Sequence, residues 1–567
     1  MTILKKNYTY ISSKINWVLL GIIIIGSILR LVNLNNVPSG LHFDEAQSGY
    51  NAFTLSKHLK NIQGEFLPTD IDYFQDFRPA GNSYLTALTV GIFGLNETTI
   101  RLPAAIFGIL TIYLTYLIAF KIFKKKEVGY FSAFLIAISP YHIVFSRAST
   151  DGIIDLFWVL LSITLVLRFL EIKNKSLLLI SYIFLLFSFF TYQTSRFMAP
   201  VLIFLLTLTH FIFYRVRTST YKWILILIMV YFIFPWGYFA VKGKTGARFN
   251  QVSTFSFPEV QRQINESVTE AGTLKIPVVL TRILHNKPLG YLQDISARHL
   301  SFFSPPLVLF DTTKPSRYRV PSMGMFSIIE FTGLLLGLYF MFRYKGNNLK
   351  WFILAALLIA PLPSSITFDD FPNFQRAIYL IPFWEILAGF GIYSLFAYSK
   401  KYRKLTFVPF FLIFSLQFTF FIYQYFLISP IHEPFYRNYE EKELALFLNS
   451  DEIKKYSKIG MSDNRGTYIF YLVFNKLDIF NLNVQKEGKY FHDNFILSNL
   501  YFSKNRCLGV GDFLKEEYSL VIQFEDCKVF SFNKPVHFFR RKDNSLALVA
   551  YQTDHKLFEE FKIKNEN

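Results

Sequence analysis

The amino-acid sequence predicts an all-α polytopic membrane protein with about 11 transmembrane helices, followed by a small extracytoplasmic α/β domain. The chain of 567 residues is 52% hydrophobic and 19% aromatic, and its mean hydropathy is +0.31. Many windows long enough to span a bilayer carry almost no charge. After residue 430 the charge density becomes that of an ordinary soluble domain.

The net charge of +19 has a simple explanation in such a protein. Lys and Arg concentrate in the cytoplasmic loops of membrane proteins, and this bias accounts for much of the excess. We therefore expect no nucleic-acid partner. Lys5, Lys6 and Lys14 precede an apolar run that starts at Trp17, and no small-x-small cleavage site follows it. This pattern indicates an uncleaved membrane anchor.

Apolar segments give the expected spans in order. They fall at 17–34, 101–123, 129–146, 152–170, 177–193, 197–214, 221–241, 322–342, 349–363, 376–398 and 405–428. One further apolar segment, 83–95, is too short for an upright helix, because about 20 residues are needed to cross a bilayer. It is either an interfacial or re-entrant helix, or a span.

The distribution of positive charge decides between these alternatives. If 83–95 does not cross the membrane, all short basic loops share the side of the N-terminus, whereas a crossing would move them to the opposite side. The positive-inside rule favours the first arrangement. The basic positions are Lys5, Lys6 and Lys14, then Lys121/Lys124/Lys125/Lys126, Arg168/Lys173/Lys175, Arg215/Arg217/Lys222, Arg343/Lys345/Lys350 and Lys400/Lys401/Arg403/Lys404.

This topology predicts a multi-pass protein of the plasma (inner) membrane with a cytoplasmic N-terminus and an extracytoplasmic C-terminus. Residues 1–430 form the membrane domain, with outer loops at 35–100 and 242–321. Residues 431–567 form the soluble domain, with a helix-like segment EEKELALFLNS and β-type runs such as YSLVIQF and SLALVAY. Cys507 and Cys527 lie in it, either as a disulfide or as separate buried thiols.

An acidic pair, Asp44 and Glu45, follows the first span by about ten residues and is flanked by His42 and Tyr50. Ionised groups are costly near a bilayer, so carboxylates beside a membrane mouth are candidates for function. The structural alternatives are an acidic outer loop or a helix N-cap made by Asp44.

Further charged and polar residues gather at the outer ends of the spans. Any one arginine there has a structural alternative, because Arg snorkels at span ends and Glu97 with Arg101 fits a plain helical ion pair. Together they place several cations and acids around one opening. The residues are Arg78, Glu97, Arg101, Arg147, Asp151, Tyr192, Gln193, Arg196, Asp369, Asp370 and Arg376.

This set suits the binding of a lipid-linked phosphate next to a carboxylate base. Guanidinium groups bind phosphate oxygens bidentately, and a carboxylate accepts the proton of an attacking hydroxyl. Phosphate leaves readily once its charge is neutralised, so no general acid is required. One base and an arginine clamp support glycosyl transfer by single displacement with inversion.

The order of motifs resembles the GT-C membrane glycosyltransferases that use polyprenyl-phosphate sugars, as bacterial relatives of the protein O-mannosyltransferases (family 39) and of the lipid A aminoarabinose transferases. The similar pieces are HFDEA, FRPAGNSYLTALTVGIFGLNETTIRLPAAIFGILTIYLTYLIAFKIF, SPYHIVFSRASTD, TYQTSRFMAP and RAIYLIPFWEILAGFG. The resemblance covers roughly residues 15–430. Where this sequence has Arg78 and Pro-Ala, the family commonly has Lys and Pro-Pro.

The resemblance implies roles for individual residues. Asp44 corresponds to the catalytic base, Glu45 is its acidic neighbour, and Asp151 is the second acidic residue. Arg376 would contact the donor phosphate, with Arg78, Arg147 and Arg196 as further candidates. A divalent cation between Asp44 and Asp151 is compatible with the family but is not required. The remaining residues that we expect to line the substrate cavity are His42, Tyr50, Tyr192, Gln193 and His299.

The expected partners are a polyprenyl-phosphate sugar donor, membrane lipid, and a lipid, glycan or protein acceptor. Family analogy alone favours a hexose such as mannose. The alternatives are a transporter or flippase for a lipid-linked saccharide and a non-catalytic component of such a pathway. A transporter would have ionisable residues near span midpoints and interrupted helices in corresponding halves. In this sequence the strong charges lie at span ends.

Overall fold

The computed structural model describes residues 16–566, except 74–75, 215–217, 243–250, 311–313, 400–402, 463–465, 487–492 and residue 516. Several basic positions used for the topology lie outside the described residues. These positions are Lys5, Lys6, Lys14, Arg215, Arg217, Lys400 and Lys401.

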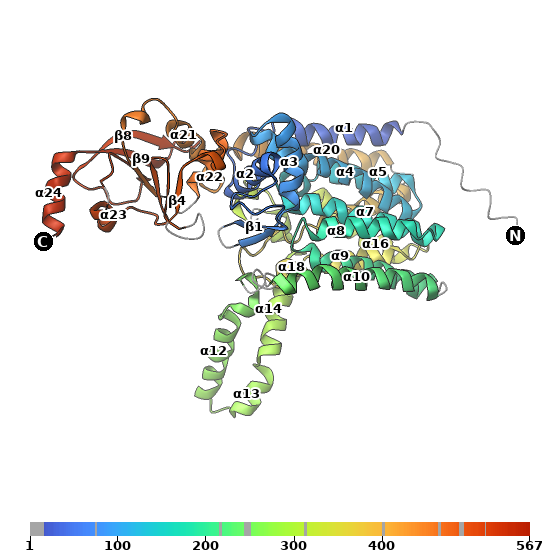
Figure 1. Ribbon diagram of the computed structural model, residues 1–567. Coiled ribbons are helices and arrows are strands. Elements are labelled where there is room, and N and C mark those ends of the chain that lie inside the picture. Colours follow the sequence, from blue (N-terminus) through green and yellow to red (C-terminus); the bar gives the residue numbers. More distant parts are fainter. Residues whose placement is uncertain are drawn as a thin grey trace.

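A bundle of apolar helices forms the larger part of the molecule (Figure 1). Every segment expected to span the membrane is largely helical, and the break in the third separates α5 from α6. The helices are α1 (Trp17–Leu31), α4 (Glu97–Phe123), α5 (Lys126–Ile138), α6 (Pro140–Ser146), α7 (Asp151–Ile172), α8 (Ser176–Phe189), α9 (Ser195–Tyr214), α10 (Thr218–Lys242), α16 (Ile328–Arg343), α17 (Lys350–Ile359), α18 (Leu362–Ser365), α19 (Leu380–Tyr398) and α20 (Arg403–Ile422), which a π-helix (Tyr423–Ile428) continues.

By length and composition, 5 helices among the described residues can each cross a membrane, and there are 6 if α5 and α6, bent by 56°, count as one span. The predicted predominance of apolar helices is therefore confirmed, while the number of about 11 spans stays a prediction. The two ends of the bundle differ. Lys121 and Lys124 pair with Glu171 at one end, and the C-terminal domain lies at the other (Figure 1).

Glycines allow α16 and α19 to cross at close range. A Cβ atom on Gly337 would lie 2.1 Å from the carbonyl oxygen of Leu387, and one on Gly391 would lie 2.2 Å from that of Gly333. Helices in lipid associate through such close packing of small residues, because burial from water provides little driving force there.

Two helices and a hairpin cover the end of the bundle nearest the C-terminal domain. They are α2 (Phe43–His58), the hairpin of β1 (Asp70–Tyr73) and β2 (Asp76–Pro79), and α3 (Gly81–Phe93). The segment expected to stay uncrossed, 83–95, lies largely within α3, whose 13 residues span only about 20 Å.

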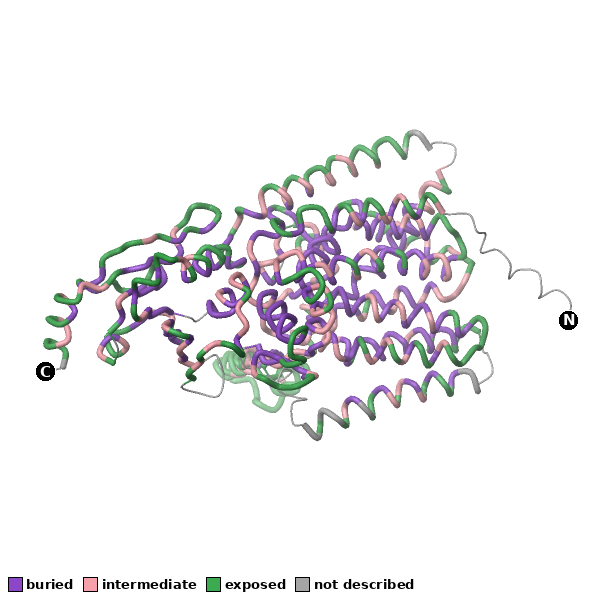
Figure 2. The backbone as a smooth tube through the Cα atoms, turned by 45° about the horizontal axis from the view of Figure 1, so that its top comes forward, coloured by how far each residue is buried: buried purple, intermediate pink, exposed green. Residues whose placement is uncertain are grey.

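Three helices within 242–321, the segment expected to be an outer loop, form an arm (Figure 1). These are α12 (Glu259–Thr273), α13 (Val278–Leu284) and α14 (Lys287–Ser301), and the short α15 (Pro305–Leu309) follows them. The arm extends away from the bundle and is largely exposed (Figure 2).

The C-terminal part is a mixed α/β domain, as predicted. Its seven-stranded sheet has the order β4-β5-β6-β3-β7-β9-β8, and β3 pairs in parallel with β6 and β7. Cys507 and Cys527 form a disulfide. The elements are α21 (Glu440–Phe447), β3 (Ile459–Ser462), α22 (Thr467–Phe474), β4 (Val484–Lys486), β5 (Phe495–Leu497), β6 (Leu500–Ser503), α23 (Val510–Lys515), β7 (Leu520–Phe524), β8 (Asn533–Arg540), β9 (Leu546–Thr553) and α24 (His555–Glu566).

One hydrophobic core joins this domain to α2. Leu41, Ala46 and Tyr50 belong to the same buried cluster as residues of the sheet and of α22. The Tyr50 hydroxyl donates to the carbonyl of Leu477 at 2.8 Å and accepts from the amide of Ile479 at 3.0 Å. The C-terminal domain therefore packs directly on the helix that carries the acidic pair.

The close crossing of α16 and α19 yields a prediction. We expect Gly337→Val to destabilise the protein by about 1–3 kcal/mol, because the new side chain meets the backbone of α19. The matched control is Leu335→Val, since Leu335 is 52% exposed on the same helix. The thermal unfolding midpoint in detergent should fall for Gly337→Val only, and equal midpoints for the two variants would contradict the packing.

Candidate active site

A cavity of about 200 Å³ opens among α2, β2, the start of α7 and the loops that follow α8, α15 and α18. It brings together segments that lie far apart in the sequence. The lining residues are His42, Asp44, Arg78, Pro79, Asp151, Tyr192, Gln193, Thr194, Pro315, Arg317, Asp370, Asn373, Gln375 and Arg376.

Asp44 lies at the first turn of α2, where its carboxylate faces two arginines. Arg78 Nη1 lies 3.0 Å from Asp44 Oδ2, and Arg317 Nη2 donates to the same oxygen at 3.1 Å. The helix begins at this point because His42 Nδ1 accepts from the Asp44 amide at 3.1 Å. The N-terminal end of a helix also favours negative charge.

These charges keep Asp44 ionised. Its partial burial raises the pKa, but Arg78 and Arg317 outweigh that effect and hold the pKa of Asp44 well below its usual range. Burial lowers the pKa of His42 to about 3, and the charge of Arg317 adds to this. At neutral pH the pair is therefore a carboxylate beside a neutral imidazole.

Arg78 links the carboxylates of the cavity. Its Nε donates to Asp76 Oδ2 at 2.8 Å, and its guanidinium lies over the ring of Tyr73. Although burial works against its charge, Asp44, Asp76 and Asp151 raise the pKa of Arg78 well above its usual value. Asp151, the first residue of α7, thus shares one cation with Asp44.

Arg376 also lines the cavity. Its guanidinium binds Asp369 bidentately, at 2.7 Å from Nη1 to Oδ1 and 2.8 Å from Nη2 to Oδ2. Gln193 donates to the carbonyl of Phe77 at 2.5 Å, and Tyr192 also lines the cavity. Burial, partly offset by Thr194 and Arg376, raises the pKa of Tyr192 to about 12, so its phenol stays protonated at neutral pH.

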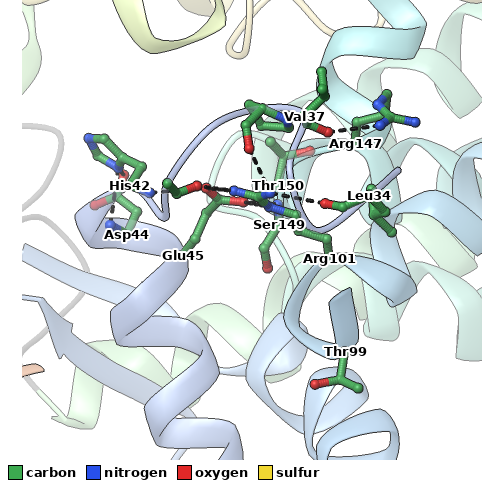
Figure 3. A network of polar contacts seen from close by, with 12 residues as sticks. Leu34, Val37, His42, Asp44, Glu45, Thr99, Arg101, Arg147, Ser149 and Thr150 are labelled. Atoms are coloured by element: carbon green, nitrogen blue, oxygen red, sulfur yellow. Dashed lines mark hydrogen bonds and ion pairs between the residues drawn. The ribbon is translucent and has the colours of Figure 1, made fainter. Parts of the chain in front are cut away.

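Glu45 points away from this cavity toward the bundle (Figure 3). Successive residues of a helix are turned by about 100°, so neighbours face different surroundings. Arg101 Nε donates to Glu45 Oε1 at 2.9 Å, and the Ser149 amide donates to the same oxygen at 3.0 Å. Glu45 also accepts from the His42 amide at 3.1 Å, which completes a capping box.

Two further arginines of the expected set are fixed elsewhere by backbone and acidic partners. Arg147 is buried and donates to the carbonyls of Leu29 at 2.9 Å and Val37 at 2.8 Å. Arg196 pairs with Asp70 at 3.1 Å. Both hold segments near the cavity without lining it.

Arg101 and Glu97, for which a helical ion pair was the structural alternative, have separate partners. Arg101 binds Glu45 and the carbonyls of the loop after α1, among them Leu34 at 3.0 Å and Pro38 at 2.9 Å. Glu97 forms an ion pair with Lys442 of the C-terminal domain.

Tyr50 and His299 also lie outside the cavity lining. Tyr50 is buried against the C-terminal domain, as described above. His299 Nε2 lies 2.7 Å from the carbonyl of Leu358, and its Nδ1 lies 3.2 Å from Ser365 Oγ. His299 therefore anchors α14 to the end of the bundle.

Arg317 was not predicted from the sequence, although it is one of the two cations on Asp44. A signal was available, because Arg317 lies between Lys314 and Arg319 in the expected outer loop 242–321. The positive-inside rule disfavours cations in segments expected on the outer side of the membrane, and this applies to Arg317 as it does to the arginines at the span ends.

A divalent cation remains a proposal for this site. The carboxylates of Asp44 and Asp151 are ligands that Mg²⁺, Ca²⁺ or Mn²⁺ accepts. The two guanidinium groups on Asp44 would oppose such an ion electrostatically. Within the described residues, the one acidic and histidine group with ligand atoms close enough for a metal is the exposed set Glu517, His555 and Glu559.

The sequence and the structure are similar to those of known proteins. Residues 78–239 match the family model described as dolichyl-phosphate-mannose-protein mannosyltransferase. The structure of ArnT from Cupriavidus metallidurans bound to undecaprenyl phosphate matches with a TM-score of 0.55 and 12% identity, over 94% of this chain and 98% of that chain. Over most of its length the chain has the fold of that protein. The resemblance predicted from the sequence is thereby confirmed.

An oligosaccharyltransferase, AglB from Archaeoglobus fulgidus, in complex with an inhibitory peptide and a dolichol-phosphate, matches with a TM-score of 0.47 and 12% identity over 81% of this chain. The chain spans 63% of the length of that protein. No protein of curated function matches the sequence significantly.

The Glu45–Arg101 pair yields a prediction about stability. We expect Arg101→Met to destabilise the protein by about 3–5 kcal/mol at neutral pH, because it leaves a buried carboxylate without its partner. The control is Arg262→Met, which removes an exposed ion pair on α12 and should cost less than about 1 kcal/mol.

The same pair has a pH dependence whose sign follows from its pKa. Burial raises the pKa of Glu45, but Arg101 lowers it to about 2. The stabilisation is present above the usual pKa of about 4 and is lost as the pH falls toward 2. The difference between Arg101→Met and the wild type in urea unfolding should therefore shrink in acid. A difference that does not change with pH would contradict the ion pair.

Proposed function

We propose that the protein is a membrane glycosyltransferase that moves a sugar from a polyprenyl-phosphate donor to a hydroxyl of an acceptor on the extracytoplasmic face. One observation carries this proposal. A carboxylate held ionised, Asp44, lines the same cavity as Arg78, Arg317 and Arg376. A base and several phosphate-binding cations thus meet at the end of an apolar helix bundle.

The comparisons support this proposal. The family model that matches residues 78–239 is described as a dolichyl-phosphate-mannose-protein mannosyltransferase. The ArnT structure, which has the same fold, is bound to undecaprenyl phosphate. Because fold alone does not determine function, the argument rests on the residues of the cavity.

The reaction is a single displacement. The acceptor oxygen forms a bond to the anomeric carbon as the bond from that carbon to the phosphate oxygen breaks, which inverts the configuration. Asp44 takes the acceptor proton. The phosphate leaves as an anion with the electron pair of the broken bond, and the guanidinium groups of Arg78, Arg317 and Arg376 stabilise its charge.

The arginines have a second effect in this mechanism. In the structure Arg78 and Arg317 compensate the negative charge of Asp44, and a donor phosphate would draw these two arginines toward its own oxygens. Asp44 would then lose part of that stabilisation, and its pKa would rise toward the range of a useful base. We propose that donor binding in this way prepares the carboxylate for the acceptor.

The proposed orientation places the cavity and the C-terminal domain outside the cytoplasm. The basic loops favour this orientation, and the disulfide between Cys507 and Cys527 fits an oxidising compartment. Arg147 and Arg196 act, in this proposal, by holding the segments around the cavity, and Glu45 acts by fixing the start of α2.

The central prediction concerns Asp44. We expect Asp44→Asn to lower kcat by about 100- to 10,000-fold, because the amide cannot accept the acceptor proton. The measurement is the release of polyprenyl phosphate from a panel of polyprenyl-phosphate sugars, beginning with mannose, by the purified protein supplied with a membrane extract as the source of acceptor.

The matched control is Asp451→Asn, whose carboxylate is 93% exposed on the soluble domain and which should leave the rate unchanged. Thermal unfolding midpoints of both variants are measured to check that each of them is folded. A transporter would release no polyprenyl phosphate, because release requires cleavage of the bond to the sugar. Undiminished release by a folded Asp44→Asn protein would refute the proposed base.

A further inference from the structure

The helical arm formed by α12, α13 and α14 has two unlike sides. The exposed residues of α12 are polar, and Arg262 there pairs with Glu259 at 2.6 Å and with Glu266 at 3.0 Å. In α12, all of whose residues the structure describes, no large apolar side chain is exposed. The hairpin is closed by Val260 and Ile264, which pack on Gly290 of α14.

The tip and the returning leg of the arm are apolar instead. Val279 is 76% exposed, Ile283 61% and Leu292 62%. A cluster of exposed large apolar side chains, such as this one, marks an interaction site. The exposed apolar residues from the tip onward are Leu274, Ile276, Val278, Val279, Leu280, Ile283, Leu284, Leu289, Leu292 and Leu300.

The charges at the tip have one sign. Lys275, Arg282 and Lys287 lie in the segment between Glu270 and Asp294, and no acidic residue lies between those two. Exposed apolar side chains mixed with Lys and Arg are typical of helices that lie in the interface of a membrane, where the cations meet anionic headgroups.

The position of the arm agrees with this pattern. In Figure 1 the bundle helices run horizontally across the view, and the arm extends downward, transverse to them, from the end that carries α2 and the C-terminal domain. Since the bundle helices cross the membrane along their axes, an arm transverse to them at this end runs along the membrane surface. Its exposed surface appears at the same end in Figure 2.

The base of the arm is fixed to the loop that lines the cavity. The Thr254 amide, just before α12, donates to the Ile366 carbonyl at 3.0 Å, and Arg298 Nη1 donates to the Thr367 carbonyl at 3.0 Å. The Arg298 guanidinium also lies over the ring of Phe371. This loop continues into Asn373 and Arg376 of the cavity.

We propose that the arm binds the outer surface of the lipid bilayer, with the tip and the exposed face of α14 inserted among anionic headgroups and α12 facing water. The arm then holds the cavity-lining loop at the level of the headgroups. This inference does not depend on the proposed transferase activity, because it uses only the arm and its surroundings.

The test uses single cysteines in the full protein reconstituted in vesicles. The two native cysteines form a disulfide, so an introduced cysteine is the only free thiol. Leu280→Cys at the tip is labelled with an environment-sensitive fluorophore, and Glu266→Cys on α12 is the matched control. Quenching by doxyl-labelled phospholipid is compared with quenching by aqueous iodide, in phosphatidylcholine vesicles with and without phosphatidylglycerol.

We expect the label at position 280 to have blue-shifted emission and to be quenched by the doxyl lipid, more strongly when phosphatidylglycerol is present. The label at position 266 should be quenched by iodide. Iodide quenching at both positions would overturn the proposal. Protection of position 280 from both quenchers would also overturn it, because a second copy of the chain would then cover the tip. Equal doxyl quenching with and without phosphatidylglycerol would refute the recognition of anionic headgroups.

Discussion

A carboxylate at the end of an apolar bundle stays ionised only where cations face it, and the cavity is built around this constraint. Asp44 has two such cations, Arg78 and Arg317, and both contact the same oxygen. They come from β2 and from a loop more than 200 residues farther along the chain. Removing either one would leave a partly buried negative charge less compensated. The charge of Asp44 thus depends on segments that only the folded chain brings together.

The helix that carries Asp44 is fixed at its start and near its middle. At its start, Glu45 caps the helix and binds Arg101, which also holds the carbonyls of the loop after α1. Farther along, Tyr50 is bonded to the C-terminal domain through Leu477. The C-terminal domain therefore helps to orient the acid at the cavity, although none of the described residues that line the cavity belongs to it. A rigid support of this kind is what an active site requires.

The sequence alone was sufficient to predict the apolar helices, the C-terminal α/β domain and several of the residues that line the cavity. Apolar runs show where helices form, and outer-face charges point to Asp44, Arg78, Asp151 and Arg376, which do share one cavity. Spacing along a helix was less informative about partners. Glu97 and Arg101 are four residues apart, yet each pairs with a residue far away in the sequence. Such contacts arise from how helices pack, which no local pattern encodes.

Loops and buried cations were the hardest to interpret for the same reason. Arg317 lies in a long loop whose path the sequence does not define. In the sequence Arg147 lies at the end of an expected span like the other arginines, but in the structure it donates to backbone carbonyls of α1 and of the loop after it. A sequence does not distinguish an arginine that donates to buried carbonyls from one that is available to bind an anion.

The central claim is that Arg78 and Arg317 keep Asp44 ionised, and it is tested most directly by the pH dependence of kcat/KM, which reports ionisations of the free enzyme. The wild type is compared with Arg317→Gln. Loss of one cation should raise the pKa of Asp44 toward its usual value, so the acidic limb of the profile should move to higher pH in the variant. An acidic limb at the same pH in both proteins would contradict the account.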